Sequence, residues 1–398
     1  MSLKTICVLP FNTLSIGSTG DQRLCCNAID GGLPNTGKVS QRTTTDWFDT
    51  PELNSVRSRM LAGEKIPECS RCWSLEDIGS NSYRNINNDF RFKDRFAKIL
   101  AGDTSTVLEK LELDLGNKCN LACRMCHPGS SKLLAEELLA INPNDSSARW
   151  YAGMDTWIKD SKLFDVIREQ GSTLKSIYLI GGEPLVIQEQ EELLDLLIEL
   201  GYAKNIELEY NSNITTLGSK WYDKWNQFKS VKINASIDGV GKFYEYVRWP
   251  ARWDKIYNNL KELKKWGDAS NGQHFVGIHS TLSNLTMPCF EQSIDTFINE
   301  LGFHLFFINV DHPNFMSPWM LPDSVRTDFA ESAIKALDKT GNTDLINNTK
   351  NTLLKIASST DPSIEFKKNF IHRMKYMDSH RKQSLLEVHP WFKEWYDL

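Results

Sequence analysis

Three cysteines in the run LGNKCNLACRMCHPG are the residues whose type and spacing say most about chemistry in this chain. Cys119, Cys123 and Cys126 have the spacing C-x3-C-x2-C, and they follow an alternating stretch, residues 110–115, that predicts a strand. Three thiolates on so short a loop can hold three corners of a four-iron four-sulfur cluster, which usually has four cysteine ligands. The spacing therefore favours a cluster with one iron open to another molecule.

A zinc site is the alternative for the same three cysteines. Zinc is normally held by four ligands, either as two cysteine pairs or with histidine completing the set. His127 follows Cys126 directly and is too close along the chain to fold back easily onto the same tetrahedron. The ligand count favours the open cluster over zinc.

A glycine-rich segment follows a second predicted strand, the apolar run 174–180. Its residues are Gly181, Gly182, Glu183 and Pro184. Two glycines let a backbone approach a ligand closely, and proline fixes the exit of the turn without an N–H group to satisfy. Alone, such a segment is also typical of an ordinary turn.

A third motif ends another predicted strand. Ser236 and Asp238 belong to the run INASIDG, and Arg248 stands ten residues after Asp238. A guanidinium group binds a carboxylate through parallel charge-assisted hydrogen bonds, so Arg248 is a candidate for holding a carboxylate ligand. A surface arginine beside an ordinary Asp-Gly turn is the alternative.

In this order the motifs resemble the radical S-adenosylmethionine (radical SAM) superfamily, over roughly residues 105–320. The resemblance implies that the open iron binds the amino and carboxylate groups of SAM, which is cleaved to methionine and a 5′-deoxyadenosyl radical. It implies SAM contacts by Gly181–Pro184, by Ser236 and Arg248, and by Asn213 in a segment similar to the family's Thr-Asn-Gly. Two residues depart from the family pattern: Met125 replaces a frequent aromatic residue, and Ile214 replaces the glycine.

Alternating strand and helix patterns predict an α/β fold. Strands are expected near residues 110–115, 174–180, 205–210, 231–236, 274–280 and 303–310, and the apolar steps over 253–267 and 290–301 each follow one helix face. Two helices split by residues 142–147 are expected between Cys126 and the second strand. Six such units are too few for a closed eight-stranded barrel, so a partial (β/α)6 barrel is expected, with its motifs at the strands' carboxyl ends.

Five further cysteines lie in the first 72 residues: Cys7, Cys25, Cys26, Cys69 and Cys72. Their order resembles a SPASM or twitch domain, the auxiliary-cluster module of many radical SAM enzymes, although most members place it after the barrel. The resemblance implies that Cys7, Cys25, Cys69 and Cys72 bind a second four-iron cluster. Neighbouring residues of an extended segment point to opposite sides, so one of Cys25 and Cys26 serves, and we favour Cys25. A four-cysteine zinc ribbon is the alternative.

The predicted organisation is an auxiliary module over 1–95, a radical SAM core over 105–320 and a helical extension over 321–398. An aromatic-rich terminus, residues 391–396, is expected to pack on the core as a strap, with a substrate lid as the alternative. His372, His380 and His389 lack metal-like spacing and are expected to be structural or exposed. Cys289 is expected to line the core.

Composition excludes several classes of protein. Hydrophobic residues make up 40% and charged residues 24%, as in ordinary soluble domains, and no apolar run is long enough to span a membrane. A net charge of −5 without a long basic cluster argues against extended nucleic-acid binding. No secretory signal is visible, and thiols stay reduced in the cytoplasm, which is therefore the expected location.

The expected function is a radical SAM enzyme of the oxidoreductase or maturase type. It would abstract hydrogen from a C–H bond of a peptide or protein side chain, with the auxiliary cluster assisting electron transfer. The expected partners are a reductant, such as flavodoxin or ferredoxin, and a peptide or small-molecule substrate. Dehydrogenation of a small alcohol is one alternative, and a non-enzymatic zinc-binding protein is a more distant one. The sequence singles out no general base or hydrogen donor.

Overall fold

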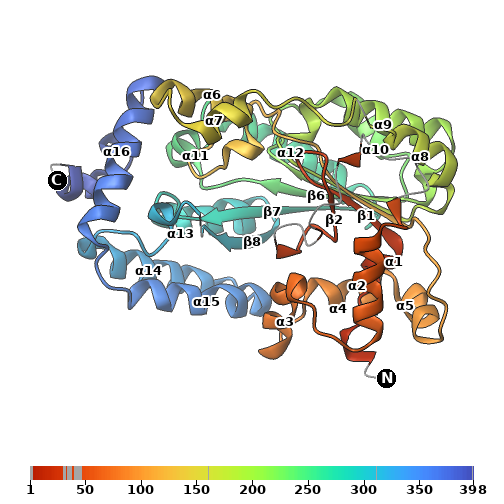
Figure 1. The fold of residues 1–398 in the computed structure, drawn as a ribbon. Helices are drawn as coiled ribbons and strands as arrows, with labels where there is room; N and C mark the ends of the chain where they lie inside the picture. Colours follow the sequence, from red (N-terminus) through yellow and green to blue (C-terminus); the bar gives the residue numbers. More distant parts are fainter. Residues whose placement is uncertain are drawn as a thin grey trace. The chain divides into compact units, whose positions relative to one another are not determined.

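Eight strands form one mostly parallel sheet in the computed structural model of the chain (Figure 1). It describes residues 3–29, 33, 38–39, 47–159, 161–310, 312–396 and 398, without the side chain of Asn348. The strands are ordered β2-β1-β3-β4-β5-β6-β7-β8. The chain divides into two compact units, residues 1–118, 153–210 and 219–231 and residues 119–152, 211–218 and 232–398.

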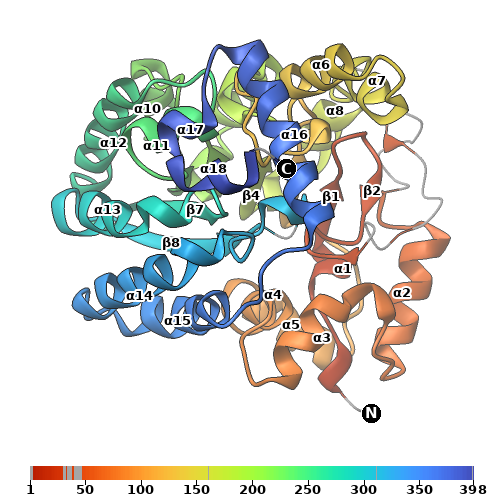
Figure 2. The same ribbon diagram turned by 90° about the vertical axis from the view of Figure 1, so that its left-hand side faces the viewer.

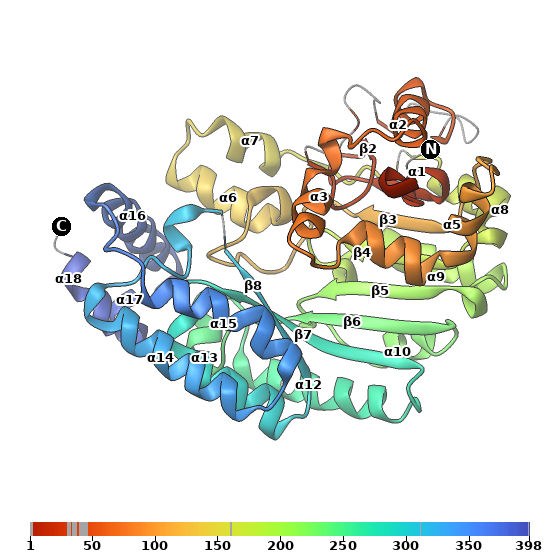
Figure 3. The ribbon, with the colours of Figure 1, turned by 90° about the horizontal axis from the view of Figure 1, so that it is seen from below.

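The first unit carries parallel strands in register. β3 (Lys110–Asp114) pairs with β4 (Ser176–Ile180), which pairs with β5 (Glu207–Ser212), as Figure 3 shows. On the other side of β3 lies β1 (Thr13–Ile16), also parallel, and β1 pairs antiparallel with β2 (Gln22–Arg23). All four residues of β1 are buried, as expected for a strand covered on both faces.

A hydrophobic core of the first unit, formed by residues between Ile6 and Ile99, includes Cys7, Cys25 and Cys69, and Cys72 is buried as well. The α-helices are α1 (Leu9–Asn12), α2 (Pro51–Leu61), α3 (Ser70–Asp77), α4 (Tyr83–Ile86), α5 (Lys93–Leu100), α8 (Leu163–Gln170), α9 (Gln188–Glu199) and α10 (Ser219–Trp225). Thr50 caps α2 by accepting a hydrogen bond from the Leu53 N–H, and Pro51 occupies the first turn, where its missing N–H costs nothing.

The second unit is built around β6 (Ser230–Ser236), β7 (His274–Leu282) and β8 (His304–Asn309), with β7 and β8 parallel. Its α-helices are α6 (Lys132–Ile141), α7 (Ser146–Ala152), α11 (Gly241–Val247), α12 (Trp253–Asp268), α13 (Phe290–Ile294), α14 (Asp323–Lys339), α15 (Thr343–Ala357), α16 (Ile364–Arg381), α17 (Leu385–Val388) and α18 (Lys393–Tyr396). A π-helical turn, η12 (Asp295–Glu300), continues α13. Helices α14 and α15 lie side by side (Figure 2).

The predicted α/β class is confirmed, and each of the six predicted strands is present within about two residues. The predicted helices over 253–267 and 290–301 are α12 and α13 with η12, and α6 and α7 flank the polar loop after Cys126. The six predicted strands did not include β1 and β2. Both are short: β1 alternates polar and apolar residues over only four positions, the lower limit for such a pattern to indicate a strand, and β2 has two residues.

The C-terminal residues pack inward, as the strap interpretation expects. Phe392 and Trp395 are buried and lie against Phe370 of α16. Cys289 is buried, as predicted. His389 is fully buried among aromatic rings. In the described part of the chain, no helix is long and apolar enough to cross a membrane.

Candidate functional site

The three-cysteine loop, residues 119–126, begins the second unit and places its thiols at different depths. Cys123 is buried, whereas Cys119 and Cys126 are partly exposed. Cys119 Sγ accepts from the Leu121 N–H at 3.4 Å, a contact that stabilises negative charge on sulfur. Burial raises the pKa of Cys126 to about 12, and the nearby Cys123 adds to the rise. A metal ion would bind these groups as thiolates and would release their protons.

The loop backbone is held against the segment that carries Arg248. The Ala122 N–H donates to the Trp249 carbonyl at 2.8 Å, and the Arg124 N–H donates to the Val247 carbonyl at 2.9 Å. These two hydrogen bonds fix the loop on either side of Arg248. The positive charge of Arg248 therefore acts on the thiols: it lowers the pKa of Cys123 against a larger rise caused by burial.

Arg248 is already paired with Asp238. Its Nε and Nη2 both lie 2.6 Å from Asp238 Oδ2. The Thr281 N–H donates to Asp238 Oδ1 at 2.6 Å, which fixes the carboxylate at the carboxyl end of β7. Asp238 therefore orients the guanidinium through Nε and Nη2, and Nη1 is the nitrogen that could bind another group. Ser236 is the last residue of β6 and partly exposed, two residues before this carboxylate.

Asn213 lies against the three-cysteine loop. Its Nδ2 donates to Asn120 Oδ1 at 3.0 Å and lies 3.9 Å from Cys119 Sγ. Ile214, which stands where the family has glycine, has φ of 53° and is fully buried. That left-handed conformation favours glycine, and a β-branched residue is a rare exception there. The backbone of the turn after β5 thus adopts a conformation typical of glycine, although the residue there is isoleucine.

The Gly181–Pro184 segment belongs to the first unit and packs against the end of β3. Gly181 has φ of +87°, and a Cβ added to it would lie 1.9 Å from Asp114 Oδ1. Gly182 has φ of +49°, and its Cβ would lie 2.3 Å from the Lys118 carbonyl oxygen, which accepts from the Glu183 N–H at 2.9 Å. Lys118 directly precedes Cys119. The two glycines thus allow close approach to the chain that leads into the three-cysteine loop.

Four of the N-terminal cysteines are brought together in the first unit, namely Cys7, Cys25, Cys69 and Cys72. Burial raises the pKa of Cys7 to about 12, and Cys72 adds to that rise. The pKa of Cys69 is raised by burial, by Cys7 and by Cys72. The pKa of Cys25 is raised by burial and then, in decreasing order, by Glu112, Cys26 and Cys7. Asn27 Nδ2 donates to Cys72 Sγ at 3.5 Å. These electrostatic effects link Cys7, Cys69 and Cys72 with one another and link Cys25 to Cys7.

Cys26 has different surroundings from the other four. Its N–H donates to Glu112 Oε2 at 2.6 Å, and its thiol is hydrogen-bonded to Tyr83 and Glu112. Glu112 also accepts from the Tyr83 hydroxyl at 2.6 Å and pairs with Lys110 at 2.7 Å in a buried ion pair. Glu112 acts on the thiol of Cys25 as well, but Cys7 is among the groups that raise the pKa of Cys25, whereas Glu112, Lys110 and Tyr83 are those that act on Cys26.

The sequence analysis did not predict the buried network of Lys110, Glu112 and Tyr83 or the contacts of Arg124. Part of the network could have been predicted, because Lys110 and Glu112 are two residues apart in a predicted strand and therefore share one face of the sheet. No sequence pattern indicates Tyr83, which lies in a short helix 27 residues before Lys110. No sequence pattern indicates the partners of Arg124 either.

The donor sets fit iron–sulfur clusters by their chemistry. Thiolates are the soft ligands that such clusters take, and each unit carries a group of cysteines that could supply them. Across the described ranges, no three His, Cys, Asp or Glu side chains are gathered as the ligands of a single ion. If clusters are bound, Cys119, Cys123 and Cys126 would hold one and the four N-terminal thiols the other.

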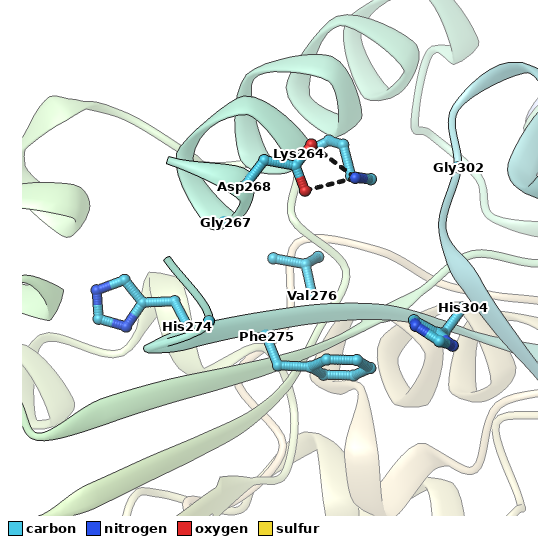
Figure 4. Close-up of a pocket in the computed structure, with 9 residues that line it drawn as sticks. Lys264, Gly267, Asp268, His274, Phe275, Val276, Gly302 and His304 are labelled. Atoms are coloured by element: carbon cyan, nitrogen blue, oxygen red, sulfur yellow. Dashed lines mark hydrogen bonds and ion pairs between the residues drawn. The ribbon is translucent and has the colours of Figure 1, made fainter. Parts of the chain in front are cut away.

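A pocket of about 290 Å³ lies at the opposite end of β7 from Asp238 (Figure 4). His274 and His304, the first residues of β7 and β8, line it together with Lys264 and Asp268 of α12. Lys264 and Asp268 are paired at 2.5 Å, and His274 stacks on Trp266. The pocket is therefore separate from the motif residues at the carboxyl ends of the strands.

The segment that contains the three motifs is similar to a known protein family. Residues 113–286 match the family model described as the Radical SAM superfamily, whose cofactors are a four-iron four-sulfur cluster and SAM. TigE of Paramaledivibacter caminithermalis, a radical SAM cyclopropyl synthase, is 23% identical over 228 residues, which are 56% of this chain and 46% of TigE. The 7-carboxy-7-deazaguanine synthase of Aquifex aeolicus is 31% identical over 105 residues, 26% of this chain and 41% of that enzyme. This chain thus spans less than half the length of these relatives. The solved structure of anSMEcpe with bound AdoMet is 17% identical, with a TM-score of 0.40, and the match covers 60% of this chain and 61% of that one.

Proposed function

We propose that this protein uses SAM to abstract hydrogen from a C–H bond in a peptide or protein side chain, because residues 113–286 match the Radical SAM superfamily model. The cluster, when bound, supplies the electron that cleaves SAM to methionine and a 5′-deoxyadenosyl radical. The chain's own residues hold the cluster, orient SAM and present the substrate.

One observation carries this proposal. Two thiols of the three-cysteine loop, Cys123 and Cys126, lie in the field of the Arg248 guanidinium, which Asp238 holds through a hydrogen bond from Nε and an ion pair with Nη2. A cation fixed beside an incomplete set of iron ligands is suited to a carboxylate that also binds the open iron. The SAM carboxylate has that property. In this proposal Asp238 positions Arg248, and Asn213 supports Cys119 by a weak N–H···S contact.

An apolar and aromatic face on β7 and β8 supports a peptide side chain as the substrate. His279 is registered with Phe306, and Thr281 with Ile308, so the four side chains share one face of the strand pair. Phe306 is 45% exposed and Ile308 57% exposed, and the His279 ring contacts Phe306 edge-on. Since Thr281 is the residue bonded to Asp238, this face extends from the Arg248 region. An apolar side chain could pack there without losing polar contacts.

The four-thiol group supports an auxiliary cluster in the first unit. Cys7, Cys25, Cys69 and Cys72 would fill all four corners, so such a cluster would transfer electrons rather than bind SAM. An external reductant, for which flavodoxin and ferredoxin are the candidates, would supply electrons to the enzyme.

Alanine variants of the three-cysteine loop test the proposal. Cys119→Ala, Cys123→Ala and Cys126→Ala, each reconstituted with iron and sulfide without oxygen, should form no 5′-deoxyadenosine from SAM and dithionite. Cys289→Ala is the matched control, because Cys289 is a buried cysteine outside both thiol groups. Turnover close to wild type in any of the three loop variants would defeat the proposal, and so would wild-type protein that binds stoichiometric zinc and no iron.

A further inference from the structure

The C-terminal helix α16 reaches into the three-cysteine loop through one buried arginine. Arg124 lies between Cys123 and Cys126 and is fully buried. Its Nε donates to the Tyr246 carbonyl at 2.7 Å, and its guanidinium lies over the Tyr246 ring, 3.7 Å from the centroid. Its Nη2 donates to Asp378 Oδ1 at 2.6 Å and to Gln383 Oε1 at 2.9 Å. The loop is thus bonded to residues more than 250 positions away.

Asp378 is the centre of these contacts. Besides Arg124, it accepts from the Tyr246 hydroxyl at 2.9 Å through Oδ1 and from the Leu385 N–H at 2.6 Å through Oδ2. Gln383 adds a second link, because its Nε2 donates to the Glu245 carbonyl at 3.2 Å. The C-terminal helical extension, residues 321–398 and here called the tail, therefore contacts the three-cysteine loop at Arg124 and also residues 245–246, which directly precede the segment hydrogen-bonded to the loop.

A second buried ion pair joins the same helix to α6, which follows the loop. Arg381 Nε and Nη2 lie 2.8 Å and 2.5 Å from the two carboxylate oxygens of Glu137, in a bidentate arrangement. The Arg381 guanidinium also lies 5.1 Å from the Trp249 ring centroid. Asp378 and Arg381, which lie one turn apart on α16, thus hold Arg124 of the loop and Glu137 of α6.

A purely structural tail would not need this arrangement. Buried ion pairs add little net stability, because desolvation offsets most of the attraction, but they impose a defined geometry when their hydrogen bonds are complete. Here the geometry is imposed on the loop that carries Cys119, Cys123 and Cys126 and on the segment that carries Arg248. The exposed ion pair of Asp361 and Lys367, on the same tail, touches neither.

We propose that Asp378 and Gln383 are positioning residues that lock the three-cysteine loop through Arg124, so that the C-terminal tail sets the geometry of the cluster site. This inference rests on the proposed function, in which the three-cysteine loop binds the cluster. The hydrogen bonds that hold the loop through Arg124 are present in the metal-free chain. The inference can therefore be tested without SAM chemistry.

Hydrogen exchange of the metal-free chain gives the first test. Asp378→Asn should speed exchange of the Ala122 and Arg124 amides by about tenfold or more, because a hydrogen bond to a charged group is worth a factor of this order in the opening equilibrium. Peptides covering β7 should be unchanged. Asp361→Asn is the matched control, with the same substitution on the same tail. Equal exchange at Ala122 and Arg124 in both variants would overturn the lock.

A second, milder variant tests the same inference if Asp378→Asn fails to fold. Gln383→Ala removes one hydrogen bond to Arg124 and leaves no buried charge unpaired, so the chain should fold, and exchange at the same two amides should rise by a smaller factor. After reconstitution, its reduced-cluster EPR spectrum with SAM should differ from that of Asp361→Asn. Identical spectra would overturn the positioning role. A wild-type chain that takes up no cluster refutes the proposed function and leaves the exchange result standing.

Discussion

Replacing Gly182 with alanine tests how closely the glycine-rich segment packs against the residue before Cys119. Gly182 has φ of +49°, and the new Cβ would lie 2.3 Å from the Lys118 carbonyl oxygen and 2.8 Å from the Lys118 carbonyl carbon. Both atoms belong to the backbone, so no side chain can rotate away to make room. The Glu183 N–H bond to the same oxygen, at 2.9 Å, would be strained as well.

The expected loss of stability has two parts. A left-handed conformation costs an alanine roughly 1–2 kcal/mol. Overpacking against fixed atoms adds about 1–3 kcal/mol. Together, Gly182→Ala should lower the free energy of unfolding by about 2–5 kcal/mol. Any relaxation must move Lys118, so 5′-deoxyadenosine formation should fall with it.

Gly201→Ala is the matched control. Gly201 has φ of +70°, but nothing lies within 4 Å of its added Cβ. This variant should therefore lose only the conformational part, roughly 1–2 kcal/mol, and keep its rate of SAM cleavage. Urea unfolding of the two metal-free variants beside wild type gives the comparison, followed by the 5′-deoxyadenosine assay. A Gly182→Ala variant as stable and as active as Gly201→Ala would refute the close packing.

Two further predictions concern His389 and the N-terminal thiols. Burial, with the charges of Arg124 and Lys242, holds the pKa of His389 well below its usual range, so it stays neutral when folded. In the unfolded chain the His389 imidazole is protonated below about pH 6.5, so the free energy of unfolding should decrease as the pH drops below that value. His389→Phe should show a smaller decrease between about pH 7.5 and about pH 5.5, measured by urea unfolding. A decrease equal to that of wild type would contradict the assignment. Replacing Cys69 and Cys72 together with alanine should lower iron from about eight to about four per reconstituted chain, with uncoupled SAM cleavage retained and substrate turnover lost. If a Cys119/Cys123/Cys126 triple variant retained no iron, the N-terminal thiols would not form an independent cluster site.

Parts of the site follow from short-range sequence alone. The three cysteines are within eight residues, so their spacing confines the thiols to one loop in almost any fold. The glycines at 181 and 182 indicated a close approach, and the structure shows what they approach, the end of β3 and Lys118. Strand and helix periodicity predicted six strands, because burial on one or both faces leaves a local pattern.

The sequence by itself determined the chemistry available to this protein: soft thiolate ligands in two groups, a guanidinium after a strand, and alternating elements that build an α/β sheet. Only the tertiary structure decided which groups meet. Arg124 and Asp378 are 254 residues apart, and no periodic pattern links a single arginine to a single aspartate. The burial of Cys25 near Cys7, and the different surroundings of Cys26, likewise depend on how distant segments pack. Local patterns record which face of an element is buried, whereas the partner of a buried polar group is fixed by where the chain returns.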